Sequence, residues 1–495
     1  MQNSTILLLL LASSALPALI IFLTPSRYVL TRNITNLSGI FSKIFFVLLL
    51  FHGLAHDEVY SLSFAFTPHS SIVLKVDTLS MLFATLSSIL WLFTTIYAIA
   101  YFKDTKNQNR FFGFFSLCVT ATVGLSVAGN LFTFFIFYEF LTLTTFALIL
   151  HTQTVEAKKA TIIYLAHTII GGLFFLVALV VLQSVSGDVE FQSGGYLGVL
   201  SDASPLFLQA IFVLLLIGIG VKAAIFPLHH WLPSAMAAPA PVSALLHAVA
   251  VVKAGAFGLI RVVYEVYGVE LSRSLGLLDI LLGVAVVTIL FGSIMALRQL
   301  DIKKLLAYST VSQVSYILLG IALFGPLGTI GAMVHLVHQG VMKITLFFCA
   351  GAFAKLHNIK KIDQLDGLGK VMPFGALAFS IAALGMIGIP PTAGFISKYY
   401  LALGAYENEL LWVLGVLALS SLLNAMYFLP LLYRIWFLAP KELHTQQQEK
   451  KGANLFLLLP ALVGALLSLL LGVFALSDWS PLGLAEKIVE LEYRR

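Results

Sequence analysis

The chain has 495 residues, of which 59% are hydrophobic and only 11% are charged. A soluble protein cannot bury that much apolar surface, so the composition excludes a water-soluble globular fold and indicates a polytopic membrane protein. The two cysteines, Cys118 and Cys349, lie in apolar runs and offer neither a disulfide framework nor iron–sulfur ligands. No nucleotide-binding loop, nucleophile elbow or clustered metal-ligand motif is visible, so we expect no cofactor and no bound metal.

Fourteen apolar stretches follow one another along the chain, each long enough to cross a bilayer at about 17–25 residues. They cover 4–23, 38–56, 78–101, 112–129, 131–150, 161–183, 206–226, 241–264, 276–297, 302–323, 327–354, 373–404, 411–438 and 453–476. The first stretch lacks a basic leader and is long enough to span, so we interpret it as a helix rather than a signal peptide. We therefore predict an all-α polytopic fold of about fourteen transmembrane helices.

We expect residues 1–495 to form a single transmembrane bundle. Its parts would be N-terminal helices at 1–110, a first repeat at 112–264, a second repeat at 276–438 and a final helix at 453–476.

The basic residues alternate between the connections of these helices. Odd-numbered connections carry nineteen Lys and Arg residues, and even-numbered connections together with the C-terminus carry six. Lys43 and Arg261 are counted among the connections. This asymmetry predicts that both termini lie on the outer side of a prokaryotic cytoplasmic membrane. Topology thus explains the net charge of +6, and we expect no nucleic-acid partner.

Four lysines and one glutamate remain inside the predicted spans: Glu139, Lys222, Lys253, Lys343 and Lys398. A charge at a helix centre costs roughly 2.5–3.5 kcal/mol on insertion scales, so an intramembrane charge by default marks a proton or ion path. Two other interpretations remain open. Glu139 could form a structural ion pair, and Lys222 could extend its amine to the inner surface.

Prolines interrupt the helices beside two of these lysines. Pro227 follows Lys222, and Pro390 and Pro391 precede Lys398. Open backbone at membrane depth is tolerated only inside protein or against a water-filled cavity, so we expect hydrated lysines at both breaks. One broken helix with a lysine in each half of the chain predicts two discontinuous helices in two inverted five-helix repeats.

A further polar stripe is expected in the stretch 327–354. Helical spacing places His335, Gln339 and Lys343 along one face, and His338 lies on the neighbouring face. A lone histidine in a span is often a hydrogen-bonded core residue, whereas a histidine and a lysine on one stripe indicate a wet path. We include His247 in the same proton path.

Three segments in chain order resemble the antiporter-like subunits of respiratory complex I and of Mrp-type cation/proton antiporters. They read "KAAIFPLHHWLPSAMAAPAPVSALLHAVAVVKAGAFGLIR", "LRQLDIKKLLAYSTVSQVSYILLG" and "GIPPTAGFISK", and the resemblance covers roughly residues 75–440. It implies discontinuous seventh and twelfth helices and a chain of buried charges at mid-depth. In that chain Glu139 and Lys222 would form an interacting pair, Lys253 would be the central relay, and Lys398 would lie near a proton exit.

The sequence departs from the family's pattern at Gln339, where a histidine is common, so proton relay there would need water or His338. The lysine at 398 and the short segment after residue 476 disfavour two branches of complex I and favour the D-type member of an Mrp-type antiporter. We therefore expect a proton-translocating subunit that works with other membrane subunits in the lipid bilayer and exchanges H⁺ for Na⁺ or K⁺. Two alternatives remain, a pumping subunit of complex I or of a membrane-bound hydrogenase, and a non-transporting scaffold.

Overall fold

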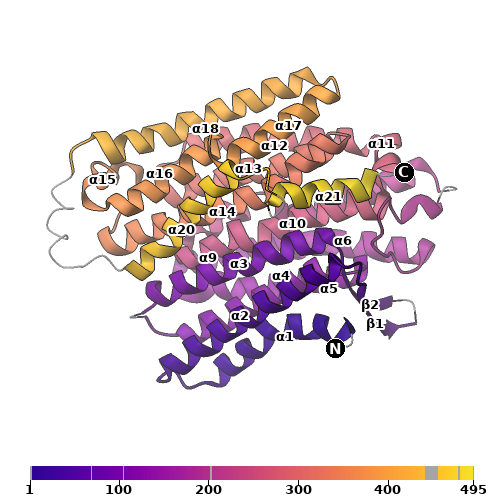
Figure 1. Ribbon diagram of the computed structural model, residues 1–495, viewed down its shortest axis with the longest axis horizontal. Coiled ribbons are helices and arrows are strands. Elements are labelled where there is room, and N and C mark those ends of the chain that lie inside the picture. The colour runs from indigo at the N-terminus through magenta and orange to yellow at the C-terminus, as the bar shows by residue number, and fades with distance from the viewer. Residues whose placement is uncertain are drawn as a thin grey trace.

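The computed structural model describes residues 3–68, 70–103, 105–200, 203–440, 455–477 and 480–493. Its helices run side by side as one elongated bundle (Figure 1). The N-terminal end of the first described helix and the C-terminal end of the last one lie toward the same end of the bundle. The β-hairpin lies at that end too (Figure 1). The helical membrane fold predicted from the sequence is therefore confirmed.

Twelve helices among the described residues are long and apolar enough to cross a membrane. Two further expected spans are not among the twelve. One is α4 (Gln108–Ser126), and the other is the broken pair α16 (Pro373–Ile387) and α17 (Ala393–Glu407). The count of fourteen spans, the division into repeats and the inverted relation between the repeats stay predictions.

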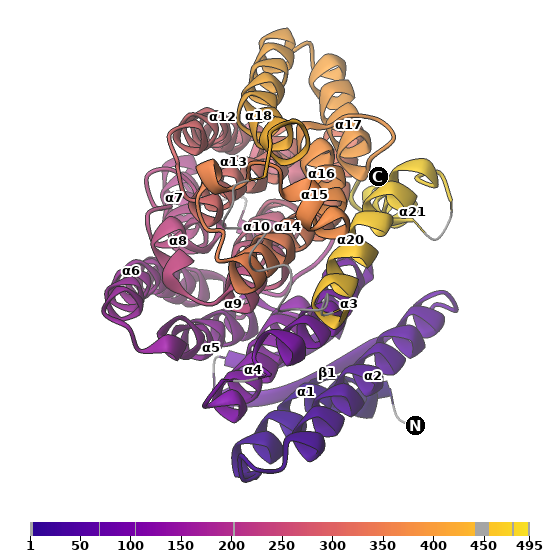
Figure 2. The same cartoon turned by 90° about the vertical axis from the view of Figure 1, so that its left-hand side faces the viewer.

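The first half of the chain forms, in order, α1 (Asn3–Leu23), α2 (Val29–Leu54), β1 (Tyr60–Thr67), β2 (Ser70–Val76), α3 (Thr78–Tyr101), α4, α5 (Leu131–Ile149), α6 (Val155–Ser186), α7 (Pro205–Ala223), α8 (Trp231–Ser234), α9 (Ala240–Ala244) and α10 (Val251–Arg261). Two π-helical turns, η4 (Leu245–Val249) and η5 (Val262–Tyr267), flank α10. Short 3₁₀ turns occur at η1 (Leu150–Thr152), η2 (Leu197–Leu200) and η3 (Ala235–Ala237). Helices α1 and α2 form an outlying pair at one side of the bundle (Figure 2).

The second half forms α11 (Val269–Ser274), α12 (Leu277–Leu297), α13 (Ile302–Ala322), α14 (Pro326–His357), η6 (Ile362–Gln364), α15 (Leu368–Val371), α16, α17, α18 (Leu411–Phe437), α20 (Leu455–Val473) and α21 (Pro481–Tyr493). Residues 453 and 454 of the expected final helix lie outside the described residues. So do Lys441, Lys450, Lys451, Arg494 and Arg495 from the charge count.

Several helix starts follow directly from the sequence. Asn130, Ser204 and Asp301 each accept a hydrogen bond from the backbone N–H three residues further on, at 2.8, 3.2 and 3.0 Å respectively. Such side chains satisfy an N–H that the first turn leaves unpaired, which stabilises a helix by about 0.5–2 kcal/mol. These caps fix where α5, α7 and α13 begin.

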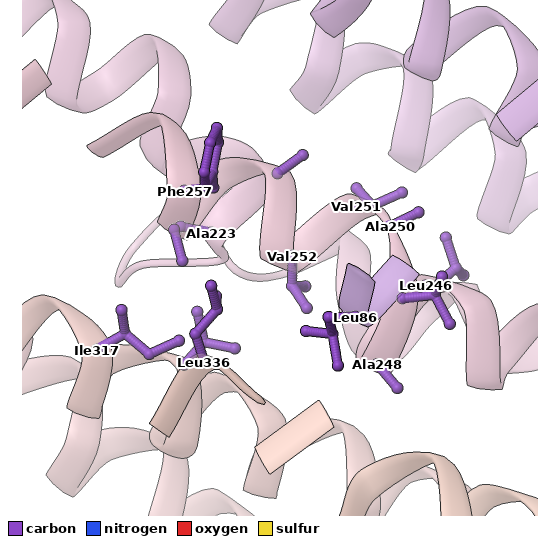
Figure 3. Packing of buried hydrophobic residues seen from close by; sticks show 14 of the residues in the cluster. Leu86, Ala223, Leu246, Ala248, Ala250, Val251, Val252, Phe257, Ile317 and Leu336 are labelled. Carbon is purple, nitrogen blue, oxygen red and sulfur yellow. The ribbon is translucent and has the colours of Figure 1, made fainter. Parts of the chain in front are cut away.

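Helices α10 and α14 lie at the centre of the bundle, enclosed by the other helices (Figure 2). The most apolar windows of the two spans that contain them are completely buried. At close range, apolar side chains of α10 such as Val252 lie across from Leu336 of α14 and Ile317 of α13 (Figure 3). A polar residue in either window is shielded from its surroundings outside the bundle, and it therefore needs a hydrogen-bond partner inside it.

The two expected helix breaks are present. Helix α7 ends at Ala223, one residue after Lys222, and Ala224 adopts a left-handed conformation with φ 56°. Helix α16 ends at Ile387, Gly388 has φ 97°, and α17 begins at Ala393. The prediction of two discontinuous helices is therefore confirmed. The π-helical turns on both sides of α10 were not expected from the sequence.

A two-stranded antiparallel hairpin was also not expected. Strands β1 and β2 pair from Tyr60 opposite Val76 to Thr67 opposite Ser70. The backbone of β2 also bonds to the segment between α4 and α5, because Lys75 N donates to Val127 O at 2.8 Å. Each strand has only seven or eight residues, which is much shorter than a membrane-spanning helix, so the pattern of long apolar runs gives no sign of the hairpin.

Lys43 and Arg261, which the charge count assigned to connections, lie deeply buried inside helices instead. Lys43 is fully buried in α2, which begins nine residues earlier than the expected 38, at Val29. Arg261 is 1% exposed at the end of α10. Both assignments were wrong because the groups that hold these cations in apolar surroundings are far away in the sequence: Lys43 Nζ donates to Leu10 O at 2.9 Å, and Arg261 pairs with Asp77.

Candidate functional site

Glu139 and Lys222 meet where α5, α6 and α7 pack together. Glu139 lies against Gly172 of α6, where a Cβ atom would stand only 2.6 Å from Glu139 Oε1. Lys222 Nζ donates to the backbone carbonyl of Tyr138 and lies 3.3 Å from the centroid of its ring. The two charged groups are close enough to interact electrostatically, although no ion pair within 4.0 Å joins them among the described residues. The structure thus places the expected pair close together without a direct ion pair between the two groups.

At both helix breaks, side chains donate to backbone carbonyls near the end of the interrupted helix. Trp231 Nε1 donates to Val221 O at 2.7 Å beside the end of α7. Lys398 Nζ donates to Met386 O at 3.0 Å and to Ile387 O at 2.8 Å, at the end of α16. Lys398 thus binds the carbonyls that the break of its own helix exposes. Hydration of the two lysines stays a prediction.

The central lysine binds the residue at which the sequence departs from the family's pattern. Lys253 of α10 is fully buried, and its Nζ donates to Gln339 Oε1 of α14. The amide nitrogen of Gln339 has no hydrogen-bond partner among the described residues. Gln339 therefore binds the central amine from the facing helix through its amide oxygen, and both N–H donors of its amide nitrogen have no partner among those residues.

The expected stripe on α14 contacts its neighbouring helices at three levels. His335 Nε2 donates to Gln313 O of α13 at 3.1 Å, and its Nδ1 lies 2.8 Å from Ser397 Oγ of α17. Two turns further along α14, Lys343 Nζ donates to Ser309 Oγ of α13 at 2.7 Å. Since Gln339 contacts α10 between these two levels, the stripe joins three helices.

The two remaining histidines lie beside this stripe. His338 Nδ1 donates to Ala393 O at 2.7 Å, at the first residue of α17. His247 lies in the π-helical turn η4, and its ring centroid is 4.6 Å from that of Phe347. Neither ring nitrogen of His247 has a hydrogen-bond partner among the described residues. Such orphaned buried groups are where internal water is expected.

Electrostatic contact connects the groups into a sequence of neighbours. Lys253 acts on both His335 and Lys343, and Lys398 acts on His335. Lys222 and Lys253 stand on adjacent helices, because Gly255 packs directly against the backbone of Ala223. The lysines and histidines named from the sequence therefore lie in neighbouring layers of one bundle.

A second set of buried charges was missed by the sequence analysis. Arg261 Nη1 lies 2.7 Å from Asp77 Oδ2 and also pairs with Glu265, and its Nη2 donates to Ser80 Oγ at 2.9 Å. Burial by itself would raise the pKa of Asp77, but the charge of Arg261 together with hydrogen bonds from Arg261 and Ser80 holds that pKa below its usual value. A half-open pocket of about 50 Å³ beside this network is lined in part by Asp77, Glu265 and Glu492. Arg261 and Glu265 are four residues apart, and this spacing is the signal that could have found the network.

The comparisons with known proteins identify the family. A family model described as "NADH:quinone oxidoreductase/Mrp antiporter, TM" matches residues 128–424, which is more than half of the chain. The chain belongs to this family. A second model, described as the N-terminus of complex I (NADH-ubiquinone oxidoreductase) chain 5, matches residues 65–112. The family suspected from three sequence segments is therefore confirmed, and the first match contains every residue from Glu139 to Lys398.

Individual relatives of this antiporter-like protein come from more than one kind of assembly. It is 36% identical to the N-type component of the NADH-quinone oxidoreductase of Desulforudis audaxviator, over 73% of this chain and 72% of the relative. It is 27% identical to the D-type component of the Na(+)/H(+) antiporter of Alkalihalophilus pseudofirmus, over 82% of this chain and 80% of the relative. In fold it resembles a chain of the Mrp complex from Dietzia sp., with a TM-score of 0.86, 23% identity and coverage of 100% of this chain and 98% of that chain.

Proposed function

We propose that this chain is the proton-translocating subunit of a multi-subunit, Mrp-type antiporter that exchanges H⁺ for Na⁺ or K⁺. The observation that carries the proposal is the burial of three lysines, Lys222, Lys253 and Lys343, at 0% exposure with hydrogen bonds to neighbouring helices. A charge at membrane depth carries a free-energy penalty, so a charge without a function is disfavoured there. Because the three lysines lie in neighbouring helices, their arrangement favours a relay over separate structural roles.

In the proposed mechanism, the first step takes place between Glu139 and Lys222. Since the two are not locked in an ion pair, a movement of the carboxylate towards Lys222 would favour a protonated amine, and a movement away would release the proton. Charge repulsion would transmit this change to Lys253 and then through the α14 stripe to Lys398. Moving one charge against a membrane potential requires about 2.3 kcal/mol per 100 mV, which the assembly has to supply.

The relatives leave two systems to distinguish. The match over 80% of the D-type antiporter component favours the antiporter, whereas the higher identity of 36% to the N-type oxidoreductase component favours a redox-driven complex of the complex I type. In both systems the chain works beside other membrane subunits. Purification of the native assembly separates the two proposals, because nickel–iron, flavin or iron–sulfur subunits would accompany only the redox-driven complex.

Substitution of Lys398 tests the relay itself. Lys398→Ala and Lys398→Arg should both abolish ΔpH-driven cation exchange in vesicles that contain the whole assembly, with subunit content checked by blotting. Arginine keeps the positive charge, but a guanidinium does not release its proton near neutral pH. Lys304→Arg, at an exposed position of α13, is the matched control and should transport normally. Normal transport by Lys398→Arg would show a structural cation and would favour the non-transporting scaffold.

A further inference from the structure

Helix α18 carries a row of neutral polar residues that face the interior of the bundle. Asn424 lies four residues after Ser420 and three after Ser421, and Tyr427 lies three residues after Asn424, so the four residues share one side of the helix. Ser420 and Asn424 are fully buried, and Tyr427 is 3% exposed. Side chains without charge did not stand out in the sequence, and the relay described above makes no use of them.

One end of this row reaches Lys343 through a directed chain of hydrogen bonds. Lys343 Nζ donates to Ser309 Oγ at 2.7 Å, and Ser309 Oγ lies 2.9 Å from the hydroxyl of Tyr427. The Tyr427 hydroxyl in turn donates to Asn424 Oδ1. A hydroxyl donates one hydrogen bond and accepts others, so the chain has a consistent direction from the ammonium group to Asn424.

The other end of the row reaches Lys398. Lys398 Nζ donates to Ser421 Oγ at 3.2 Å. Tyr316 of α13 stands beside this contact, with its ring centroid 5.2 Å from Lys398 Nζ and its hydroxyl next to Ser420 and Ser421. The row therefore has a lysine at each end, Lys343 fully buried and Lys398 partly buried.

Between the two ends lie polar atoms without a hydrogen-bond partner of normal geometry among the described residues. They are Asn424 Nδ2 and the hydroxyl of Tyr316, both buried. Asn424 is one helical turn from Ser420 and Ser421, and Tyr316 is next to both serines and close enough to Tyr427 to interact electrostatically. Buried polar groups in proteins are almost always bonded to protein or to ordered water, so this gap is suited to a bridging water.

We propose that Ser309, Tyr427 and Ser421, with one water held by Asn424 and Tyr316, form a proton wire that joins Lys343 to Lys398. This inference rests on the proposed relay and gives it a second route beside His335. In each passage the ammonium of Lys343 gives a proton to Ser309, which gives its own to Tyr427. The Tyr427 hydroxyl then turns from Asn424 Oδ1 to the water and gives it a proton, the water gives one to Ser421, and Ser421 gives its own to the neutral amine of Lys398. Every hydroxyl ends with the proton count it began with, and one positive charge has moved.

Tyr427→Phe tests the wire, because it removes the hydroxyl and keeps the ring. We expect ΔpH-driven exchange by the whole assembly in vesicles to fall roughly tenfold, the effect of losing a hydrogen bond in a charge-linked chain. Ser421→Ala should reduce the rate similarly, and Ser421→Thr, which keeps the hydroxyl, should restore it. Tyr433→Phe on the same helix, where the side chain is 57% exposed, is the matched control and should transport normally. A merely structural role for the row would not make the rate depend on the hydroxyl at 421.

Lys398→Arg run in parallel distinguishes failure of the wire from failure of the relay. If Lys398→Arg is inactive while Tyr427→Phe and Ser421→Ala transport at the normal rate, the relay stands and the wire is refuted. If Lys398→Arg transports normally, the proposed function fails and the wire fails with it. If Tyr427→Phe lowers the amount of subunit in the membrane, the pair Ser421→Ala and Ser421→Thr decides, and equal rates for those two variants would overturn the proposal.

Discussion

Replacing Arg261 by methionine should destabilise the folded subunit more than any other single change in its ion network. Arg261 is 1% exposed, and its partners Glu265 and Asp77 have side-chain exposures of 5% and 29%. The substitution leaves two carboxylates without their cation, and removal of one partner from a buried pair costs about 3–5 kcal/mol. Glu265→Gln should cost less, because Arg261 keeps its two contacts with Asp77, at 2.7 and 3.1 Å.

The double variant Arg261→Met with Glu265→Gln provides the decisive comparison. It removes the most deeply buried carboxylate together with its cation, so it should recover part of the stability that Arg261→Met loses. Residues in direct contact are expected to show such non-additive effects. The measurement is the unfolding temperature of the purified assembly in detergent for the wild type, the two single variants and the double variant. An unfolding temperature for Arg261→Met equal to that of the wild type, or a double variant less stable than both single variants, would refute the reasoning.

The same network predicts a pH dependence. Arg261 holds the pKa of Asp77 below its usual value of 3.8, so the folded state binds fewer protons at this carboxyl than the unfolded state. The stabilisation from the pair is therefore complete above about pH 3.8 and is lost as the pH falls towards the lower pKa of the folded protein. Arg261→Met should flatten the acid side of the stability profile, and an unchanged acid side would contradict the assignment.

Two further predictions concern the relay. Gly172→Ala should slow transport, because the new Cβ would stand 2.6 Å from Glu139 Oε1 and displace the carboxylate. The amount of subunit in the membrane should change little, because the displaced group is the end of a flexible side chain. Gly283→Ala is the control: its added Cβ would have no neighbour within 4 Å, so this variant should transport normally in the same vesicle assay. Gln339→Leu should reduce transport by roughly tenfold, since it removes the acceptor of a charged donor, Lys253, whereas Gln339→His should keep most of the rate. Equal rates for the leucine and histidine variants would show that Lys253 does not need this partner.

Much of the architecture could be predicted from the sequence because the bilayer imposes simple requirements. A span needs a long apolar run, and a charge within such a run stands out against it. Lys222, Lys253, Lys343 and Lys398 were therefore found one residue at a time. Proline and glycine likewise marked the breaks in α7 and between α16 and α17, because their effect on the backbone is local.

What the sequence could not show are the features that depend on contacts between distant segments. Arg261 pairs inside the bundle with Asp77, 184 residues earlier, as well as with nearby Glu265, and the local sequence around Arg261 resembles the end of a span. The neutral row on α18 is similar: Tyr427 and Ser421 acquire a role through Ser309 on α13 and Lys398 on α17, and serine and tyrosine are common in membrane helices without such partners. Composition and periodicity thus determined that this chain spans a membrane and carries buried charges. The packing of α10 and α14 at the centre decided which neighbours those charges have, because hydrogen bonds and electrostatic contacts act over a few ångströms in space, whatever the separation along the chain.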